Sequence, residues 1–570
     1  MTSSAANPVL GTPVLQTALG TPVLQIQGLA VRLVEGRDDG RDDNPSGHAP
    51  RHVVQDISFD IHAGETLCVV GESGSGKSVT SFSVMGLLAP DALRPCAGRI
   101  LLDGEDILTC SPERLRQLRA TRMSMVFQEP MTALNPVRTV GWQIDEVLRA
   151  HSKLNAAERK KKILDMLQAV RLPDIERIYA SYPHQLSGGQ RQRIVICMAL
   201  ILDPKLLIAD EPTTALDVTT QKQILTLIRD LQKSHDTAVL FITHDFGVVA
   251  DIADRIAVMH RGRIVEVGTR EQILAQPREA YTRMLVSSVP SLAPATRVAP
   301  EGVPLLTVRS LNKTYTERGL FKARRSVKAV NDVSFTLHKK EILGIVGESG
   351  SGKSTVARCI ARLIDPSSGS VRIGDQEIAT ASRREFRPLR QRIQVVFQDP
   401  YRSLNARMRV GDSITEGLRN FGKGRQEARQ RATELLELVG LNSEAMARYP
   451  HQFSGGQRQR ICIARALALS PDILIADEAV SALDVSVQAQ VLDLIESIRE
   501  QTGTAVLFIT HDLRVAAQIC NTIVVMKSGK IVEAASAHEV LSQPRDAYTR
   551  QLIDAAPGRH WDFQNFRPTA

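Results

Sequence analysis

The sequence predicts an α/β protein built from two tandem copies of one domain, and three observations lead to this prediction. The octapeptide GESGSGKS occurs at residues 71–78 and again, unchanged, at residues 347–354. The motifs FQ[ED]P, YPHQ[LF]SGGQRQRI, LIADE and FITHD follow it in both copies, in the same order and at nearly constant spacing. Short apolar runs alternate with helical patterns in each copy. Collinear repetition of this kind indicates a duplicated domain.

The apolar runs predict the buried strands of a mainly parallel sheet in each copy. TLCVV and EILGIV lead into the two glycine-rich loops, LLIAD and ILIAD end in carboxylates, and AVLFIT occurs in both copies. Helical patterns such as QILTLIRDLQ separate these runs, as expected for parallel strands joined by helices. Residues 130–181 and 400–448 space apolar side chains three and four positions apart, which predicts an inserted helical lobe in each copy.

A proline-rich stretch separates the two copies. Residues 289–304 (VPSLAPATRVAPEGVP) show no amphipathic period, which is typical of a linker. Each copy ends in a similar element, QPREAYTRML or QPRDAYTRQL. The predicted divisions are a poorly ordered extension with a duplicated LGTPVLQ at 1–22, a first domain at 23–288, the linker at 289–304, a second domain at 305–560 and a tail at 561–570.

Composition excludes several classes of protein. The formal net charge of +9 arises from scattered Lys and Arg residues, so no nucleic-acid partner is expected. No apolar run reaches the roughly 18 residues that a spanning helix needs, so any membrane crossing must be made by another chain. The seven cysteines form no CxxC pair, which fits reduced thiols in a cytosolic protein and argues against a zinc site.

The repeated octapeptide matches GxxxxGK[ST], a loop whose backbone N–H groups surround phosphates at the start of a helix. The lysines of the two copies reach the β- and γ-phosphates, and the serines that follow them can bind Mg²⁺. The predicted phosphate-binding residues are Gly71, Glu72, Ser73, Gly74, Ser75, Gly76, Lys77 and Ser78 in the first copy and Gly347, Glu348, Ser349, Gly350, Ser351, Gly352, Lys353 and Ser354 in the second. This loop alone does not separate kinases, GTPases and ATPases.

LSGGQRQR, which follows the loop in the first copy, resembles the signature of ATP-binding cassette (ABC) ATPases, and all core motifs of that family occur twice, over residues 23–560. The resemblance implies two tandem ABC-type P-loop ATPase domains, each with a mainly parallel sheet, an inserted helical subdomain and an antiparallel β subdomain. It also implies that the P-loop of one half and the signature of the other enclose each ATP. The first site would borrow Ser454, Gly455, Gly456 and Gln457, and the second would borrow Ser187, Gly188, Gly189 and Gln190.

The resemblance carries further roles to matching positions. Asp210 and Asp477 match the aspartates that hold Mg²⁺, and Gln128 and Gln398 match the glutamines that touch Mg²⁺ and sense nucleotide. Glu211 and Glu478 match the general bases that polarise the attacking water, a role that fits a carboxylate beside the γ-phosphate. His244 and His511 match the histidines that contact the γ-phosphate, and Asp217 and Asp484 match the loop that crosses to the other half.

One position departs from the family pattern. Family members carry an aromatic residue in the first strand that stacks on adenine. Tyr315 occupies this position in the second copy, whereas Leu33 occupies it in the first. Stacking at the first site is therefore in question.

Three classes of ABC protein fit a chain with two such domains and no membrane segment. DNA-repair or chromosome ATPases need long coiled coils or zinc modules, which this sequence lacks. Soluble two-domain translation factors have a long charged helical linker, whereas residues 289–304 carry only Arg297 and Glu301. The motifs and the AYTR elements closely resemble those of the dipeptide, oligopeptide and glutathione importer ATPases, so an importer ATPase is expected and the translation factor remains the alternative.

The importer resemblance implies a chain at the cytoplasmic face of the inner membrane, bound to two transmembrane permease subunits and supplied by an extracytoplasmic solute-binding protein. Both ATPases are fused here, so no homodimer is required. Residues 281–304 contain no cysteine, and no iron–sulfur cluster is expected. The cargo is expected to be a peptide, with nickel, opine and murein-peptide transport as alternatives. By this resemblance the docking groove would lie between the Gln128 and Gln398 loops and the helical lobes, and the surface near residues 131–140 and 401–410, which includes Leu134 and Leu404, is expected to carry the coupling.

Overall fold

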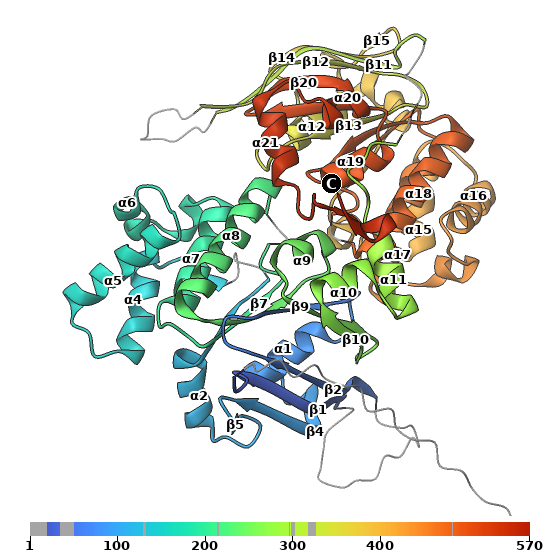
Figure 1. The fold of residues 1–570 in the computed structure, drawn as a ribbon. Helices are drawn as coiled ribbons and strands as arrows, with labels where there is room; N and C mark the ends of the chain where they lie inside the picture. Colours follow the sequence, from blue (N-terminus) through green and yellow to red (C-terminus); the bar gives the residue numbers. More distant parts are fainter. Residues whose placement is uncertain are drawn as a thin grey trace, which may run out of the picture.

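The computed structural model describes residues 20–34, 51–128, 133–213, 216–295, 297, 302–316, 326–481 and 483–569. Most of the predicted N-terminal extension, including the first LGTPVLQ copy at 10–16, lies outside these residues, whereas the second copy at 19–25 is described from residue 20 onward. Figure 1 shows two similar halves in contact, the first coloured blue to green and the second yellow to red. We call them half one and half two.

A six-stranded sheet forms the centre of each half, and both sheets have the same strand order. In half one the order is β10-β9-β3-β8-β7-β6, and in half two it is β20-β19-β13-β18-β17-β16. The bounds are β3 Thr66–Val70, β6 Met123–Val126, β7 Leu206–Asp210, β8 Ala238–Ile242, β9 Arg255–His260, β10 Arg263–Thr269, β13 Ile342–Val346, β16 Ile393–Val396, β17 Ile473–Asp477, β18 Ala505–Ile509, β19 Thr522–Lys527 and β20 Lys530–Ser536.

Five strands of each sheet run parallel, and only β10 and β20 pair antiparallel at an edge. The predicted strands β3, β7, β8, β13, β17 and β18 are buried along their whole length. Helices cover both faces of such sheets, which is why these strands read as unbroken apolar runs. The predicted parallel sheets are thus confirmed.

A four-stranded antiparallel sheet packs beside each central sheet. The orders are β2-β1-β4-β5 and β12-β11-β14-β15. The bounds are β1 Leu24–Leu33, β2 His52–Ile61, β4 Leu93–Leu102, β5 Glu105–Asp106, β11 Leu306–Thr316, β12 Ser326–Leu337, β14 Ser368–Ile373 and β15 Gln376–Glu377. This is the antiparallel β subdomain that the family resemblance implies.

Helices make up the inserted lobes and the covering layers. In half one they are α1 Lys77–Met85, α2 Pro112–Thr121, α4 Val140–His151, α5 Ala156–Ala169, α6 Ile175–Ala180, η1 Pro183–Gln185, α7 Gly188–Leu200, α8 Val218–His235, α9 Phe246–Ile252, α10 Arg270–Ala275 and α11 Ala280–Ser287. In half two they are α12 Lys353–Ile360, α13 Arg383–Phe386, η2 Pro388–Gln391, α14 Pro400–Ser403, α15 Val410–Asn420, α16 Arg425–Leu438, η3 Ser443–Ala447, η4 Pro450–Gln452, α17 Gly455–Leu467, α18 Val485–Thr502, α19 Leu513–Ile519, α20 Ala537–Ser542 and α21 Ala547–Ala555.

The helical lobes occur where the spacing of apolar residues predicts them. They contain α4 to α7 in half one and α15 to α17 in half two. The signature helices α7 and α17 begin at capping boxes, in which Ser187 pairs with Gln190 and Ser454 with Gln457. The S-x-x-Q spacing satisfies two backbone N–H groups that a helix start would otherwise leave unpaired. The motif therefore fixes where each signature helix begins.

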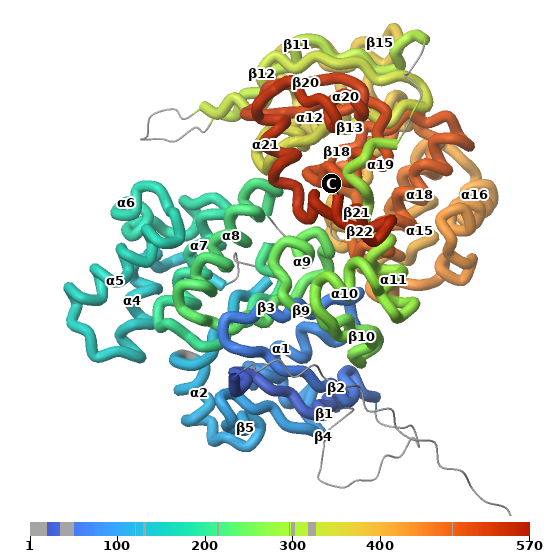
Figure 2. Tube along the Cα trace, viewed as in Figure 1, coloured from blue at the N-terminus to red at the C-terminus, as the bar shows by residue number. Residues whose placement is uncertain are grey.

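The segment that follows each half packs on the other half. After half one, Leu292 packs against the apolar core of half two, and Arg297 binds Glu496 and the backbone carbonyl of Gln518. After half two, the chain forms β21 (Trp561–Asp562), η5 (Phe563–Asn565) and β22 (Arg567–Pro568). Figure 2 shows this end of the chain beside α10 and α11 of half one.

Phe563, at the centre of this terminal segment, is buried in the core of half one. The predicted linker and tail therefore contain residues that pack on the opposite half, and we call 289–295 and 556–569 the crossing segments.

Within the described residues, no helix has both the length and the apolar character that crossing a membrane requires.

Candidate functional site

The two glycine-rich loops join β3 to α1 and β13 to α12. Gly71 and Gly347 have φ of 150° and 148°, and a Cβ on either would lie 2.2 Å from a carbonyl oxygen, that of Met259 or Met526. Only glycine allows the backbone to approach so closely. The loops therefore take the form that phosphate binding needs.

The lysine of each loop is buried and held by the loop itself. Lys77 Nζ donates to the carbonyl oxygens of Gly71 at 2.7 Å and Glu72 at 3.0 Å. Lys353 Nζ donates to Gly347 at 2.7 Å and Glu348 at 2.9 Å. Burial lowers the pKa of both lysines, and nearby carboxylates oppose that shift. A phosphate would give each ammonium group a stronger partner than these carbonyls.

A serine hydroxyl from each loop meets an aspartate at the end of β7 or β17, which lies two strands away from the strand that enters the loop. Ser78 Oγ donates to Asp210 Oδ1 at 3.3 Å, and Ser354 Oγ donates to Asp477 Oδ1 at 2.8 Å. Burial raises the pKa of Asp210 to about 6, although the Ser78 hydrogen bond opposes the shift. Hydroxyl and carboxylate oxygens are the ligands that Mg²⁺ prefers, so the residues present fit this ion.

The predicted general base of each half contacts two other predicted site residues. Gln128 Nε2 donates to Glu211 Oε2 at 2.8 Å, and His244 Nδ1 lies 3.1 Å from Glu211 Oε1. Burial disfavours the charged imidazole, but the hydrogen bond and the charge of Glu211 outweigh it and raise the pKa of His244. The structure thus brings together the glutamine, the glutamate and the histidine of half one.

Half two repeats this cluster with small differences. Gln398 Nε2 donates to Glu478 Oε2 at 2.7 Å, and His511 Nδ1 lies 3.7 Å from Glu478 Oε1. Both glutamates adopt a left-handed backbone, with φ of 47° at Glu211 and 50° at Glu478. Such a conformation is costly for a residue other than glycine and is concentrated at functional sites.

The predicted crossing loops contact the phosphate-binding loop of the opposite half. Asp484 Oδ1 accepts hydrogen bonds from the Ser73 N–H at 2.9 Å and the Ser73 hydroxyl at 3.0 Å. The hydroxyl of Ser486 also donates to Glu72. In the reverse direction, the hydroxyl of Thr219 donates to Glu348. Both P-loops therefore contact the other half of the chain.

A cavity at the second P-loop contains residues of both halves. Its volume is about 530 Å³, and half one contributes Leu216 and Asp217 to its lining. Half two lines the rest of it with P-loop, strand-end and histidine residues, among them Lys353, Glu478 and His511. The site is thus composite in its geometry.

The two signatures do not close these sites in the structure. Among the residues that the structure describes, no hydrogen bond joins Ser187–Gln190 or Ser454–Gln457 to a P-loop. Gly189 packs against Thr220 and Gly456 against Val487, where an added Cβ would lie only 2.6 and 2.3 Å from the side chain. Each signature is therefore packed on the helix that follows the crossing loop of its own half.

The adenine position differs between the halves as the sequence predicts. Tyr315, near the end of β11, is 42% exposed, and Lys313 Nζ lies 5.3 Å from the centre of its ring. Leu33 ends β1 opposite Leu93 and presents no ring. Residues 35–50, which follow Leu33, lie outside the described part of the chain.

A tyrosine that supports each P-loop was not predicted. Tyr281 and Tyr548, from the repeated AYTR elements, accept hydrogen bonds from the backbone N–H of Glu72 at 3.3 Å and Glu348 at 3.1 Å. Burial raises the pKa of each tyrosine to about 12. The recurrence of AYTR at matching positions was the available signal, although it does not identify the partner.

A hollow of about 490 Å³ lies beside the Gln128 loop of half one. Phe127, Val147, Met198 and Leu202 give it an apolar lining, and Arg116 and Arg119 lie at the same hollow. The prediction that Leu134 and Leu404 form such a surface is wrong. They are 3% and 4% exposed, because both side chains pack into the lobe cores.

Comparisons with known proteins identify the family of this chain. The family model "ABC transporter" matches residues 54–214 and 330–481, and "Oligopeptide/dipeptide transporter, C-terminal region" matches 265–322. The glutathione import ATP-binding protein GsiA of Escherichia coli O157:H7 is 47% identical over 537 residues, which cover 88% of this chain and 86% of GsiA. The peptidoglycan transport ATP-binding protein YejF of Agrobacterium fabrum is 46% identical over 515 residues, which cover 90% of this chain and 94% of YejF.

These matches extend over both halves, and they contradict the alternative of a translation factor. The chain therefore belongs to the ABC transporter family, as a two-domain ATP-binding protein of the oligopeptide, dipeptide and glutathione importer group.

Proposed function

We propose that the chain energises a peptide importer by hydrolysing ATP at two composite sites, each made from both halves. The hydrogen bonds from Ser73 to Asp484 carry this proposal, since they place the crossing loop of half two on the P-loop of half one. In each site the P-loop binds the phosphates, and Ser454–Gln457 or Ser187–Gln190 closes the open side when ATP brings the halves together.

Glu211 and Glu478 then orient the attacking water. The Gln128 amide and the His244 ring hold the two oxygen atoms of Glu211, which fixes the direction of its carboxylate. A positioned carboxylate of this kind can accept the proton of the attacking water. His244 and His511 contact the γ-phosphate, and the signature N–H groups stabilise the charge that develops on it.

Ser78, Asp210 and Gln128 would hold Mg²⁺ at the first site, and Ser354, Asp477 and Gln398 at the second. The ion would neutralise the negative charge of the transferred phosphate. Domain bounds of 23–288 and 305–560 fit this assignment, because each range then contains one complete set of motifs.

The partners we propose are two permease subunits, with the chain held by them at the cytoplasmic face of the inner membrane. The apolar hollow lined by Phe127 and Met198 suits a short amphipathic helix of a permease, since Gln128 adjoins it and can transmit the state of the site. An extracytoplasmic binding protein would select the cargo.

A short peptide is the cargo we propose, because the relatives are named for glutathione and for peptidoglycan, and both compounds contain peptides. The test reconstitutes the chain with its permeases in liposomes and adds binding protein loaded with glutathione, a dipeptide or a murein peptide. We expect one of these to stimulate ATP hydrolysis and to accumulate, and the Glu211→Gln/Glu478→Gln protein to do neither. Hydrolysis that responds to none of the peptides would contradict the proposed cargo class.

A further inference from the structure

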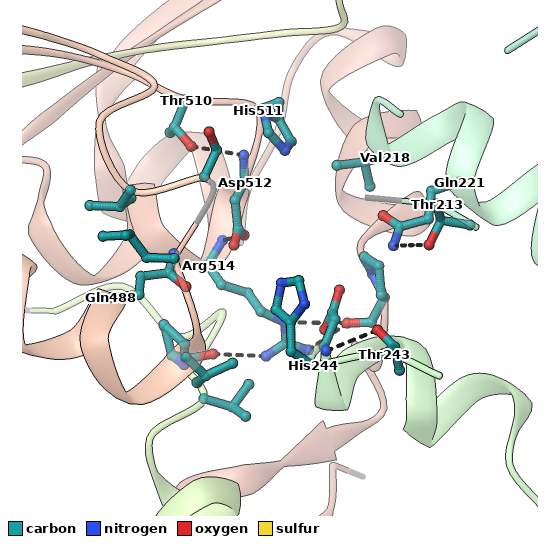
Figure 3. Close-up of a pocket in the computed structure, with 18 of the residues that line it drawn as sticks. Thr213, Val218, Gln221, Thr243, His244, Gln488, Thr510, His511, Asp512 and Arg514 are labelled. Atoms are coloured by element: carbon teal, nitrogen blue, oxygen red, sulfur yellow. Dashed lines mark hydrogen bonds between the residues drawn. The ribbon is translucent and has the colours of Figure 1, made fainter. Parts of the chain in front are cut away.

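A small cavity at the centre of the interface is lined by matching residues of both halves. Its volume is about 120 Å³. The pairs that line it include His244 with His511, Asp245 with Asp512, and Pro290 with Pro557. Such matched pairs mark the approximate two-fold axis that relates the halves. Figure 3 shows that Arg514 lies in this cavity together with both switch histidines.

Arg514 binds both crossing segments at once. Its Nη1 donates to the carbonyl oxygen of Pro290 at 2.9 Å, and its Nε and Nη2 donate to that of Pro557 at 3.2 and 2.9 Å. Its guanidinium also lies 5.1 Å from the ring centre of Phe563. Arg514 is only 6% exposed. All three nitrogen atoms of a buried cation are thus used on segments that belong to different halves.

The matching position in half one is Gly247, the third residue after His244. An added Cβ at Gly247 would lie 2.8 Å from the Pro557 carbonyl oxygen, and one at Gly558 would lie 2.7 Å from the Gly247 Cα. The Gly558 N–H donates to Asp251 at 3.1 Å in the same region. The terminal crossing segment therefore occupies the space that a second arginine would need. Half two therefore places the Arg514 cation beside the axis, whereas half one has Gly247 there, which leaves space for the terminal crossing segment.

Carboxylates of both halves surround the cation. Asp512 accepts a hydrogen bond from the backbone N–H of Arg514 at 2.8 Å, and Asp245 accepts one from the backbone N–H of Gly247 at 2.8 Å. Burial lowers the pKa of Arg514, whereas the charges of Asp512, Asp245 and Asp251 oppose that shift. The carboxylates that follow the two switch histidines therefore both favour the charged guanidinium.

We propose that Arg514 is a positioning residue shared by the two ATP sites: it fastens both crossing segments to the His511 loop, so that the halves remain joined at this point when the nucleotide gap is open. The contacts at the P-loops must change as the signatures close, whereas the crossing segments link the halves covalently and by packing. Arg514 ties these segments together beside both switch histidines. It thereby limits how far the halves separate before ATP binds.

The test measures the distance between the helical lobes of the full chain. Spin labels are placed at Lys161 and Arg429, which are exposed positions on α5 and α16, after replacement of the native cysteines. Glu211→Gln and Glu478→Gln block hydrolysis. We expect Arg514→Ala to lengthen and broaden the nucleotide-free distance. The ATP concentration for half-closure should rise severalfold, whereas the distance at saturating ATP should stay unchanged, since the closed sites do not include Arg514.

Arg119→Ala is the matched control, because Arg119 also donates to two backbone carbonyls, those of Met85 and Gly86, but within half one. It should lower the melting temperature without changing the nucleotide-free distance. Arg514→Lys keeps the charge but has one nitrogen atom for two carbonyls, and we expect an intermediate distance. Wild-type distances and ATP dependence in folded Arg514→Ala would overturn the proposal. If Arg514→Ala does not fold, the same result in Arg514→Lys would overturn it.

Discussion

The two halves share the residues to which we assign the reaction, but they differ at the proposed adenine position, at the proposed docking hollow and at the interface. In both halves a lysine, an aspartate, a glutamine, a glutamate and a histidine occupy the same places. The adenine position, by contrast, carries Leu33 in half one and Tyr315 in half two. Beside the Gln loop, Met198 of half one matches Arg465 of half two, whose Nη1 donates to the Ser403 carbonyl oxygen at 2.6 Å.

The comparison indicates that the two copies kept the residues assigned to ATP hydrolysis, whereas the residues around them have diverged. The step needs fixed atoms around the γ-phosphate, and these atoms come from backbone-defined loops and strand ends that both halves retain. The contacts outside that shell serve binding and assembly, which tolerate two different solutions in one chain. Five experiments can break or sharpen this comparison.

The largest effect is expected from loss of either general base. Glu211→Gln and Glu478→Gln should each reduce ATP turnover of the assembled transporter by roughly a hundredfold or more, the usual cost of losing a positioned proton acceptor. Steady-state hydrolysis with saturating Mg-ATP measures this. Near-normal turnover in one of the two variants would show that the halves are not equivalent in chemistry.

The crossed arrangement is tested by disulfide trapping in a chain without native cysteines. Cysteines at Ser75 and Gly456 should link when ATP closes the Glu211→Gln/Glu478→Gln protein, because a disulfide needs Cα atoms within about 4.4–6.8 Å. Cysteines at Ser75 and Gly189 serve as the within-half control. A link in the control and none across the halves would mean that each half closes its own site.

Permease docking should depend on the apolar hollow of half one. Met198→Glu places a charge in that lining, so co-purification with the permeases should be lost while nucleotide binding remains. Val267→Glu, at an exposed position on β10, is the control. Full permease recovery with Met198→Glu would place the docking surface elsewhere.

The tyrosines that support the P-loops should act alike in both halves. Tyr281→Phe and Tyr548→Phe each remove one hydrogen bond to a P-loop N–H, at a cost of about 0.5–1.5 kcal/mol. ATP affinity, measured by calorimetry in the Glu211→Gln/Glu478→Gln protein, should fall severalfold at the altered site. The ring of His260 stacks on that of Tyr281, with 3.9 Å between the ring centres, and should keep the phenylalanine ring in place. Unchanged affinity would assign these hydroxyls a purely local role.

An effect as small as that at the tyrosines is expected at the adenine position. Leu33→Tyr should strengthen nucleotide binding at the first site by about 0.5–1.5 kcal/mol, the worth of an aromatic contact beyond burial. Tyr315→Leu should weaken the second site by a similar amount. Fluorescent nucleotide titration measures both. If Leu33→Tyr changes nothing, another residue already holds the adenine at that site.

The strands and lobes could be predicted from the sequence because each is encoded locally, whereas the roles of the site residues were assigned by family resemblance. A five-residue apolar run reports burial on two faces, and GESGSGKS carries its own backbone geometry. The AYTR tyrosines and the segment around Phe563 could not be predicted, since their partners lie far away in the chain. Leu134 was misassigned because a loop beside a motif appears exposed, whereas the lobe folds over it.

The position of Arg514, beside the approximate two-fold axis, has a consequence for the kind of chain that can carry it. A dimer of identical subunits repeats every residue about its axis, so an arginine at this position would meet its own copy, and a glycine would leave the centre without a cation. One cation on the axis requires two subunits that are different. Fusion of the two halves guarantees that difference in every molecule. One chain then always carries both Arg514 and Gly247 at its interface.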